Sequence, residues 1–181
     1  MEVLERDRIV ITARNWLMHR WPDPIDHPVQ IAFLRGVLDG LKSRQITFAI
    51  HEDYDESLVE KLQLENVTIF RGKNEAEYIE LYTDARSVIL ASRLHAGMLA
   101  LANGVPAVFV GHDTRTYSFC EMMGIDSIEL FSDGAAQQAL SHLRAVLSGD
   151  VDAFGGLGAR YTSLYHGMWR FLETNNLPVA R

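Results

Sequence analysis

The fold is decided by Asp84-Ala-Arg-Ser-Val-Ile-Leu-Ala-Ser92-Arg93-Leu94-His95-Ala96, a stretch with the pattern of a buried strand that leads directly into a helix. The apolar run Val88 to Ala91 suits a strand that is covered on both faces. Ser92 is a good N-cap, which would place Arg93 and His95 in the first turn of the helix. Free backbone N–H groups and the positive end of the helix dipole lie at such a start, so the sequence predicts an anion site there.

The same alternation of strand and helix continues on both sides of this stretch. Apolar strand-like runs occur at about 8–13, 45–50, 66–70, 86–91, 105–110 and 127–131. Helical patterns lie between them, among others at 29–41, 57–64, 75–82 and 135–147. Strict alternation predicts an α/β fold, a doubly wound, Rossmann-like parallel sheet with helices on both faces. Ligands of such folds bind beyond the carboxyl ends of the strands, so the residues directly after each strand are the candidates for a site.

Length and composition indicate one soluble domain. The chain has 181 residues, and we expect an α/β core over 1–150 and a helical tail over 151–181. A net charge of −7 without clustered Lys and Arg argues against a nucleic-acid binder. The longest apolar stretch, Ala96 to Val110, contains Pro106 and is too short to span a membrane. Because the N-terminus does not resemble a signal peptide and Cys120 is the single cysteine, we expect a cytoplasmic protein that could work at the inner face of the membrane.

Cationic side chains follow several of the predicted strands, namely Arg14, Arg93, His95 and Arg115. Arg93 is the strongest candidate for an anion clamp because its planar guanidinium can bind an oxyanion bidentately. The alternative is that Arg93 pairs with Asp84 or another carboxylate at the sheet edge. Arg14 could instead be a solvent-exposed loop residue.

His95 could act as a general acid, because an imidazole can hold and release a proton near neutral pH. A capping or packing role is the alternative. Asp113 could orient a hydroxyl or His95, or it could cap the helix that follows. Ser92 lacks the Gly-x-Ser-x-Gly context of a hydrolase nucleophile and is interpreted as a cap. No metal site is predicted, because the other histidines, His19, His27, His51, His112, His142 and His166, show no paired ligand spacing.

The motif Ser92-Arg-Leu-His-Ala96, a helix that ends at Gly104-Val-Pro106, a second apolar strand and Asp113-x-Arg115 together resemble the C-terminal half of the polysaccharide pyruvyltransferase family. The resemblance extends from about Arg8 to Gly124, and Arg-Leu-His-Ala is its most specific part. The family typically has Asp-Pro-Lys where this chain has Asp-Thr-Arg, which keeps the charges. The resemblance implies one half of a glycosyltransferase-B fold, on the donor side.

The resemblance also implies a transferase that moves a pyruvyl group from phosphoenolpyruvate to a sugar of a cell-surface polysaccharide or exopolysaccharide, with no other cofactor. A small anionic donor and a saccharide acceptor would be its partners. The implied donor-binding residues are Arg14, Ser92, Arg93, Leu94 and Arg115, with Leu94 contributing its backbone N–H. The implied catalytic residues are His95 and Asp113.

The family has two Rossmann-like halves and this chain resembles one, so we expect its partner to be an N-terminal domain or a second copy of the chain. The segment 15–28, with Trp16 and Trp21, predicts a loop near the ligand edge that is either a lid or an anchor on the domain. Aromatic and aliphatic residues at helical spacing over 161–172 predict a tail that either packs on the chain's own sheet or joins copies into an oligomer. Two other functions stay open: a donor domain for a nucleotide sugar, and a non-catalytic interaction domain.

Overall fold

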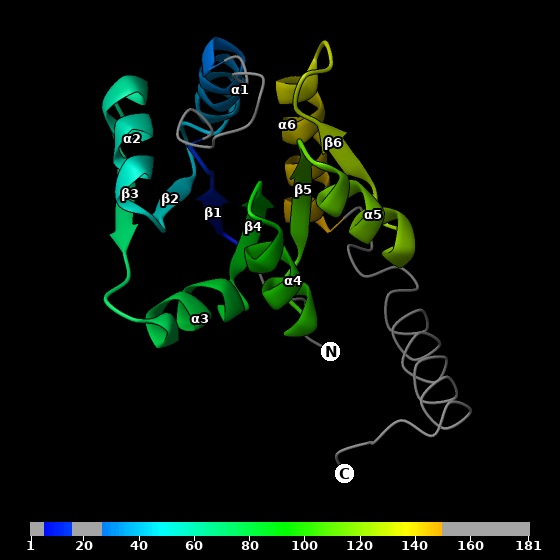
Figure 1. Cartoon of the computed structure of the whole chain (residues 1–181). Coiled ribbons are helices and arrows are strands. Elements are labelled where there is room, and N and C mark those ends of the chain that lie inside the picture. Colours follow the sequence, from blue (N-terminus) through cyan, green and yellow to red (C-terminus); the bar gives the residue numbers. More distant parts are fainter. Residues whose placement is uncertain (1–5, 16–26, 150–181) are drawn as a thin grey trace, which may run out of the picture.

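One sheet of six parallel strands forms the centre of the computed structural model, which describes residues 6–15 and 27–149. The strands are β1 (Arg8–Thr12), β2 (Gln45–Ile50), β3 (Val67–Arg71), β4 (Ser87–Ala91), β5 (Ala107–Gly111) and β6 (Ser127–Glu129). Their order across the sheet is β3-β2-β1-β4-β5-β6, which confirms the predicted doubly wound fold (Figure 1).

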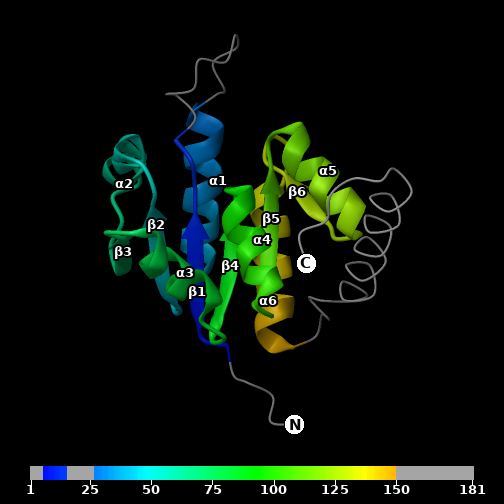
Figure 2. The same ribbon diagram turned by 60° about the horizontal axis from the view of Figure 1, so that its bottom comes forward.

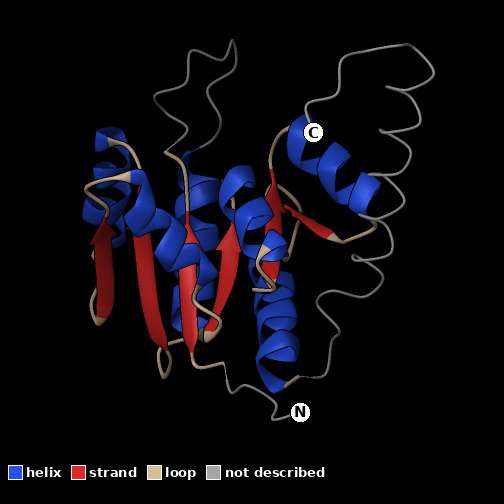
Figure 3. Ribbon diagram, turned by 90° about the horizontal axis from the view of Figure 1, so that it is seen from below, coloured by secondary structure: helices blue, strands red, loops and turns tan. Residues whose placement is uncertain are grey.

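Two layers of helices cover the sheet. The helices are α1 (His27–Gly40), α2 (Glu56–Leu62), α3 (Glu75–Thr83), α4 (Leu94–Ala102), α5 (Thr114–Met123) and α6 (Ala135–Ser148), and the short helix η2 (Asp53–Asp55) precedes α2. Helices α1, α2 and α6 pack on one face with one hydrophobic cluster, while α3, α4 and α5 pack on the other with a second cluster. Figures 1 and 2 show α1 and α6 on the opposite side of the sheet from α3 and α4, and Figure 3 shows the strands side by side between them.

The strands are apolar on both faces because both faces are covered. In β4, Val88 and Leu90 belong to the cluster under α1 and α6, and Ile89 and Ala91 belong to the cluster under α3 and α4. All of these side chains are at most 1% exposed. This explains why β4 is a continuous apolar run rather than an alternating one.

Element boundaries agree with the sequence predictions to within about two residues at most ends. At the start of the predicted loop over 15–28, Asn15 lies outside the strands and helices, as expected. At its end the prediction is wrong, because α1 already begins at His27. The rest of that loop and the tail over 151–181 lie outside the described residues. Cys120 is free and 2% exposed, which confirms its interpretation as a small buried residue.

The order of the strands creates a switch point between β1 and β4. The chain leaves β1 toward β2 on one side and later returns through α3 to place β4 on the other side. Connections therefore diverge at the carboxyl ends of these two strands, where doubly wound folds bind ligands. In residues 6–15 and 27–149, no helix has the length and apolar character that crossing a bilayer requires.

Gly97 allows α4 to lie close against the sheet, and we predict that Gly97→Ala destabilises the fold. A Cβ atom at this position would lie 2.4 Å from Cε1 of Phe109 and 2.9 Å from Cβ of Ala91. Overpacking of this kind costs about 1–3 kcal/mol of unfolding free energy, which urea denaturation would measure. Met98→Ala on the exposed side of the same helix is the control and should change the unfolding free energy by less than about 0.5 kcal/mol. Equal stability of the two variants would contradict the prediction.

Candidate functional site

The strand ends at the switch point bring three chain segments together. Thr12 at the end of β1 pairs with Ala49 of β2 and with Ala91 of β4, so the residues after these strands are neighbours. Arg14 and Asn15 follow β1, His51 and Glu52 follow β2, and Ser92 and Arg93 follow β4. The structure therefore places three of the predicted site residues, Arg14, Ser92 and Arg93, at the carboxyl ends of neighbouring strands.

The start of α4 differs from the sequence prediction. Ser92 is not the N-cap, because its hydroxyl donates a hydrogen bond to the carbonyl oxygen of Thr12 at 2.8 Å. Arg93 is the N-cap instead, with extended backbone (φ −100°, ψ 109°) and no side-chain capping bond, so the first helical turn begins at Leu94. The carbonyl of Arg93 accepts from the N–H groups of Ala96 and Gly97.

Two backbone donors remain at this helix start. Within the described part of the chain, neither the N–H of Leu94 nor that of His95 makes a hydrogen bond. Such uncapped donors, together with the helix dipole, favour an anion in front of them. This part of the anion-site prediction therefore has a structural basis even though Ser92 does not cap the helix.

The guanidinium of Arg93 points to a buried carboxylate. Its Nη2 atom donates to Oδ2 of Asp55 at 2.5 Å, and its Nε atom donates to the carbonyl of Ala13 at 3.4 Å. The side chain of Arg93 is 15% exposed, whereas that of Asp55 is fully buried. Of the two pairings that the sequence left open, the one with Asp84 is wrong, since Asp84 pairs with Arg8.

Asp55 holds the strand ends together. Besides Arg93, its carboxylate accepts from the backbone N–H of Asn15 at 2.9 Å and from those of His51 and Glu52, both at 3.2 Å. Of these four hydrogen bonds, Oδ1 accepts the one from Asn15 and Oδ2 accepts the other three. Sequence reasoning missed Asp55, although its place just after a predicted strand could have drawn attention to it.

Asn15 and Arg14 both take part in hydrogen bonds with neighbouring segments of the chain. The side-chain amide of Asn15 donates to the carbonyl of Tyr54 at 2.8 Å and to the hydroxyl of Ser57. The carbonyl of Arg14 accepts from the buried amide of Gln30 at 2.6 Å. The Nε atom of Arg14 is buried without a hydrogen-bond partner among the described residues. Arg14 is thus half-buried beside the switch point and not a solvent-exposed loop residue.

His51 forms a stack with two tyrosines next to Arg93. Its ring lies 4.6 Å from that of Tyr78 and 5.8 Å from that of Tyr82, and its Nε2 atom shares a hydrogen bond with the hydroxyl of Tyr82. Burial, together with the positive charge of Arg93, lowers the pKa of His51 from 6.5 to about 4, although Asp55 acts in the opposite direction. The imidazole is therefore neutral at neutral pH.

His95 is the second residue of α4. It is exposed, and no partner for its side chain is found among the residues that the structure describes. The capping or packing role considered from the sequence therefore has no contact to support it. An exposed imidazole beside free N–H groups can meet a ligand from solvent.

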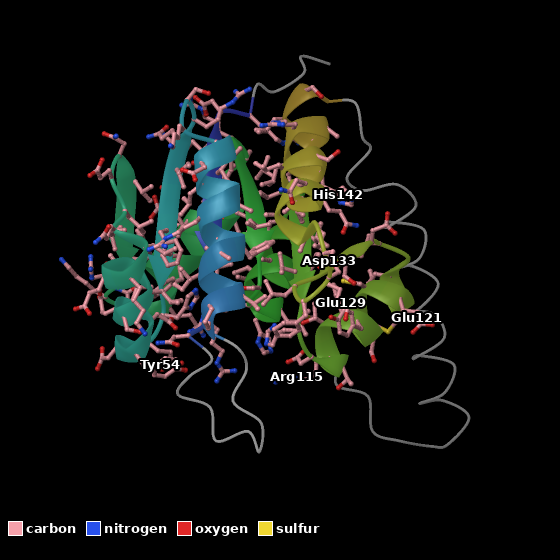
Figure 4. All side chains as sticks on the ribbon, turned by 90° about the horizontal axis from the view of Figure 1, so that it is seen from above. Tyr54, Arg115, Glu121, Glu129, Asp133 and His142 are labelled. Carbon is pink, nitrogen blue, oxygen red and sulfur yellow. The ribbon has the colours of Figure 1, made fainter. Side chains whose placement is uncertain are left out.

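Asp113 caps α5, as one of the two interpretations of the sequence proposed. Its carboxylate accepts from the backbone N–H of Thr116 at 3.0 Å and from Nη2 of Arg115 at 2.6 Å. Burial by itself would raise the pKa of Asp113, but these hydrogen bonds outweigh it and lower the pKa to about 2. No contact between Asp113 and His95 occurs in the described chain. Figure 4 shows Arg115 at the same end of the molecule as Tyr54, which follows β2.

Within residues 6–15 and 27–149, no three His, Cys, Asp or Glu side chains gather in a way that could hold a metal ion. The chemistry that the described side chains can supply is that of N–H donors, guanidinium groups and an exposed imidazole.

We predict that His51 titrates at about pH 4 rather than near 6.5, as NMR of its imidazole signals would show. Because the pKa of His51 is lower in the folded protein, the unfolded chain binds this proton at a higher pH than the folded protein does. The stability that neutral His51 contributes is therefore complete above pH 6.5 and is lost as the pH falls from there toward 4. His51→Phe keeps a ring in the stack and should remove this part of the acid sensitivity. A titration midpoint close to 6.5 would show that the ring is not buried as described.

Comparison with known proteins shows to which family the chain belongs. No curated protein matches the chain. The family model for polysaccharide pyruvyl transferase matches residues 5–114, from the segment before β1 to the start of α5, which includes every strand end of the switch point. Because the match covers more than half of the chain, the protein belongs to the polysaccharide pyruvyl transferase family.

Proposed function

We propose that the chain binds phosphoenolpyruvate at the switch point between β1 and β4 and acts as the donor-binding half of a pyruvyltransferase. The family match supports the transferase class. The observation that carries the donor site is the pair of free N–H groups at Leu94 and His95, which directly follow Arg93 in the chain. The side chain of Arg93 reaches the carbonyl of Ala13, one residue before Arg14 and just after the end of β1.

The chemistry of phosphoenolpyruvate matches these groups. Its phosphate and carboxylate need several N–H donors at once, and a helix start together with a guanidinium provides them. The donor would lie in front of α4, with its anionic groups toward Leu94 and Arg93. This orientation leaves its methylene carbon on the side of the exposed imidazole of His95.

We assign His95 as the general acid of the transfer. A proton from His95 to the methylene carbon makes the methyl group, and one hydroxyl of the saccharide adds to the neighbouring carbon. A second hydroxyl then displaces phosphate to close the ketal, and the two hydroxyl protons balance those taken by the methyl group and the phosphate. Asp113, ionised at neutral pH, could accept a hydrogen bond from an acceptor hydroxyl but could not act as the acid.

Leu94→Pro tests the backbone donor of α4 without removing a charge. Proline is well tolerated at the first position of a helix, and the extended backbone of Arg93 suits a residue before proline. Leu94→Ala is the matched control, since it loses the same partly buried side chain but keeps the N–H. We expect phosphoenolpyruvate to bind about 10-fold or more weakly to Leu94→Pro than to Leu94→Ala, because a hydrogen bond to a charged group contributes about 1.5–3 kcal/mol.

NMR titration of the labelled protein would measure both affinities. Equal affinities of the two variants would remove this N–H from the donor site. A parallel titration with a uridine-diphosphate sugar tests the nucleotide-sugar alternative. Binding of the nucleotide sugar without binding of phosphoenolpyruvate would replace the proposed donor.

His95→Gln tests the general acid. Glutamine keeps a polar side chain at the helix start but cannot transfer a proton, so pyruvyl transfer should fall by about 10²–10⁴-fold while phosphoenolpyruvate binding stays unchanged. His142→Gln, on the distant helix α6, is the control and should leave transfer intact (Figure 4). Transfer within a few-fold of that of the unaltered protein would return His95 to a structural role.

A further inference from the structure

We propose that Asp55 is a positioning residue that acts through Arg93. It makes the guanidinium a directed hydrogen-bond donor rather than a source of net charge. The inference rests on the proposed function, because it concerns how Arg93 meets the anionic donor. It adds a residue that lies outside the motif around Arg93, in the segment that follows a different strand.

The first step is that Asp55 is held in place by several hydrogen bonds. Its carboxylate is fully buried, and three backbone N–H groups, from Asn15, His51 and Glu52, hold it in addition to Arg93. Its own N–H donates to the carbonyl of Glu52 at 2.8 Å. The carboxylate is therefore fixed by the ends of β1 and β2 and offers Arg93 a rigid anchor.

The second step is that this anchor uses only part of the guanidinium. Nη2 bonds to Asp55 and Nε to the carbonyl of Ala13, which fixes the plane of the group. Nη1 lies 3.9 Å from the half-exposed carboxylate of Glu52, beyond hydrogen-bond distance, and makes no hydrogen bond in the described part of the chain. The protein thus binds the guanidinium through Nε and Nη2, and Nη1 remains for a ligand.

The third step concerns charge. Arg93 and Asp55 together are neutral, and the half-exposed carboxylate of Glu52 adds a negative charge 3.9 Å from Nη1. Arg93 would therefore attract an anion through the direction of its N–H groups and not through excess positive charge. A lysine could pair with Asp55 or with a ligand, but its single ammonium group lacks the planar set of N–H donors with which a guanidinium binds both partners in fixed directions. If Asp55 merely cancelled the charge of Arg93, its removal would strengthen anion binding. If Asp55 positions Arg93, its removal must weaken binding.

Titration of phosphoenolpyruvate into the labelled protein distinguishes these cases. We expect Asp55→Asn and Arg93→Lys each to weaken binding by about 10-fold to 100-fold, the effect of losing one hydrogen bond to a charged group. In a double-mutant cycle, Asp55→Asn should have little further effect once Arg93 is replaced by lysine. Ser57→Ala is the matched control, since it disturbs the bond to Asn15 but leaves the Asp55–Arg93 pair intact. This control should bind like the unaltered protein.

Several outcomes would overturn the proposal. Asp55→Asn that binds as tightly as the unaltered protein, or more tightly, would show that the carboxylate only neutralises charge. If Asp55→Asn lowers the affinity equally in the unaltered protein and in the Arg93→Lys variant, the role of Asp55 is purely structural. Should Asp55→Asn not fold, Arg93→Lys alone tests the proposal. Unchanged affinity of this lysine variant would show that binding does not need the directed N–H groups of a guanidinium.

A spectroscopic measurement separates this inference from the proposed function. A guanidinium held on one edge rotates slowly, so the Nη protons of Arg93 should give resolved NMR signals that merge in Asp55→Asn and persist in Ser57→Ala. This measurement needs no donor. Absence of phosphoenolpyruvate binding by the unaltered protein would refute the donor assignment, and merged Arg93 signals in that same protein would refute positioning by Asp55.

Discussion

The buried ion pair between Asp55 and Arg93 is the interaction on which the arrangement of the switch point depends. It joins the segment after β2 to the start of α4, and the same carboxylate binds the backbone after β1. A buried pair of this kind does not stabilise a fold efficiently, because desolvation offsets much of the attraction. Removing one partner is nevertheless costly, since the other charge stays buried. The pair therefore contributes more to fixing the geometry of the strand ends than to the total stability.

Around this pair, the parallel sheet provides the frame and the helix start provides the donors. The close approach of α4 to the sheet, made possible by Gly97, determines where the N–H groups of Leu94 and His95 lie. The stack of His51 on Tyr78 lies next to the pair and remains uncharged at neutral pH. The strand ends at the switch point thus combine the largely buried pair of Asp55 and Arg93 with the exposed side chain of His95.

The fold could be predicted from the sequence because its signals are local: apolar runs such as Val88 to Ala91 alternate with helical patterns, and that alternation admits few topologies. The site could be predicted only in part. The motif around Arg93 and His95 points to this part of the sheet, and their roles stay predictions. The prediction of Ser92 as the cap is wrong, because a local rule cannot show that the carbonyl of Thr12 lies within reach of its hydroxyl. Asp55 was missed for the same reason, since its partner Arg93 is 38 positions away along the chain.

The contacts of Asp55 also have a consequence for folding. Its partners include Asn15, 40 positions before it, and Arg93, 38 positions after it, and they meet only once β1, β2 and β4 lie side by side. Contacts between residues so far apart in sequence form late and slowly compared with those inside a helix. In a chain whose helices have formed but whose central strands are not yet assembled, these residues would lie apart and could not form the proposed site. The proposed anion site would therefore form only together with the native topology.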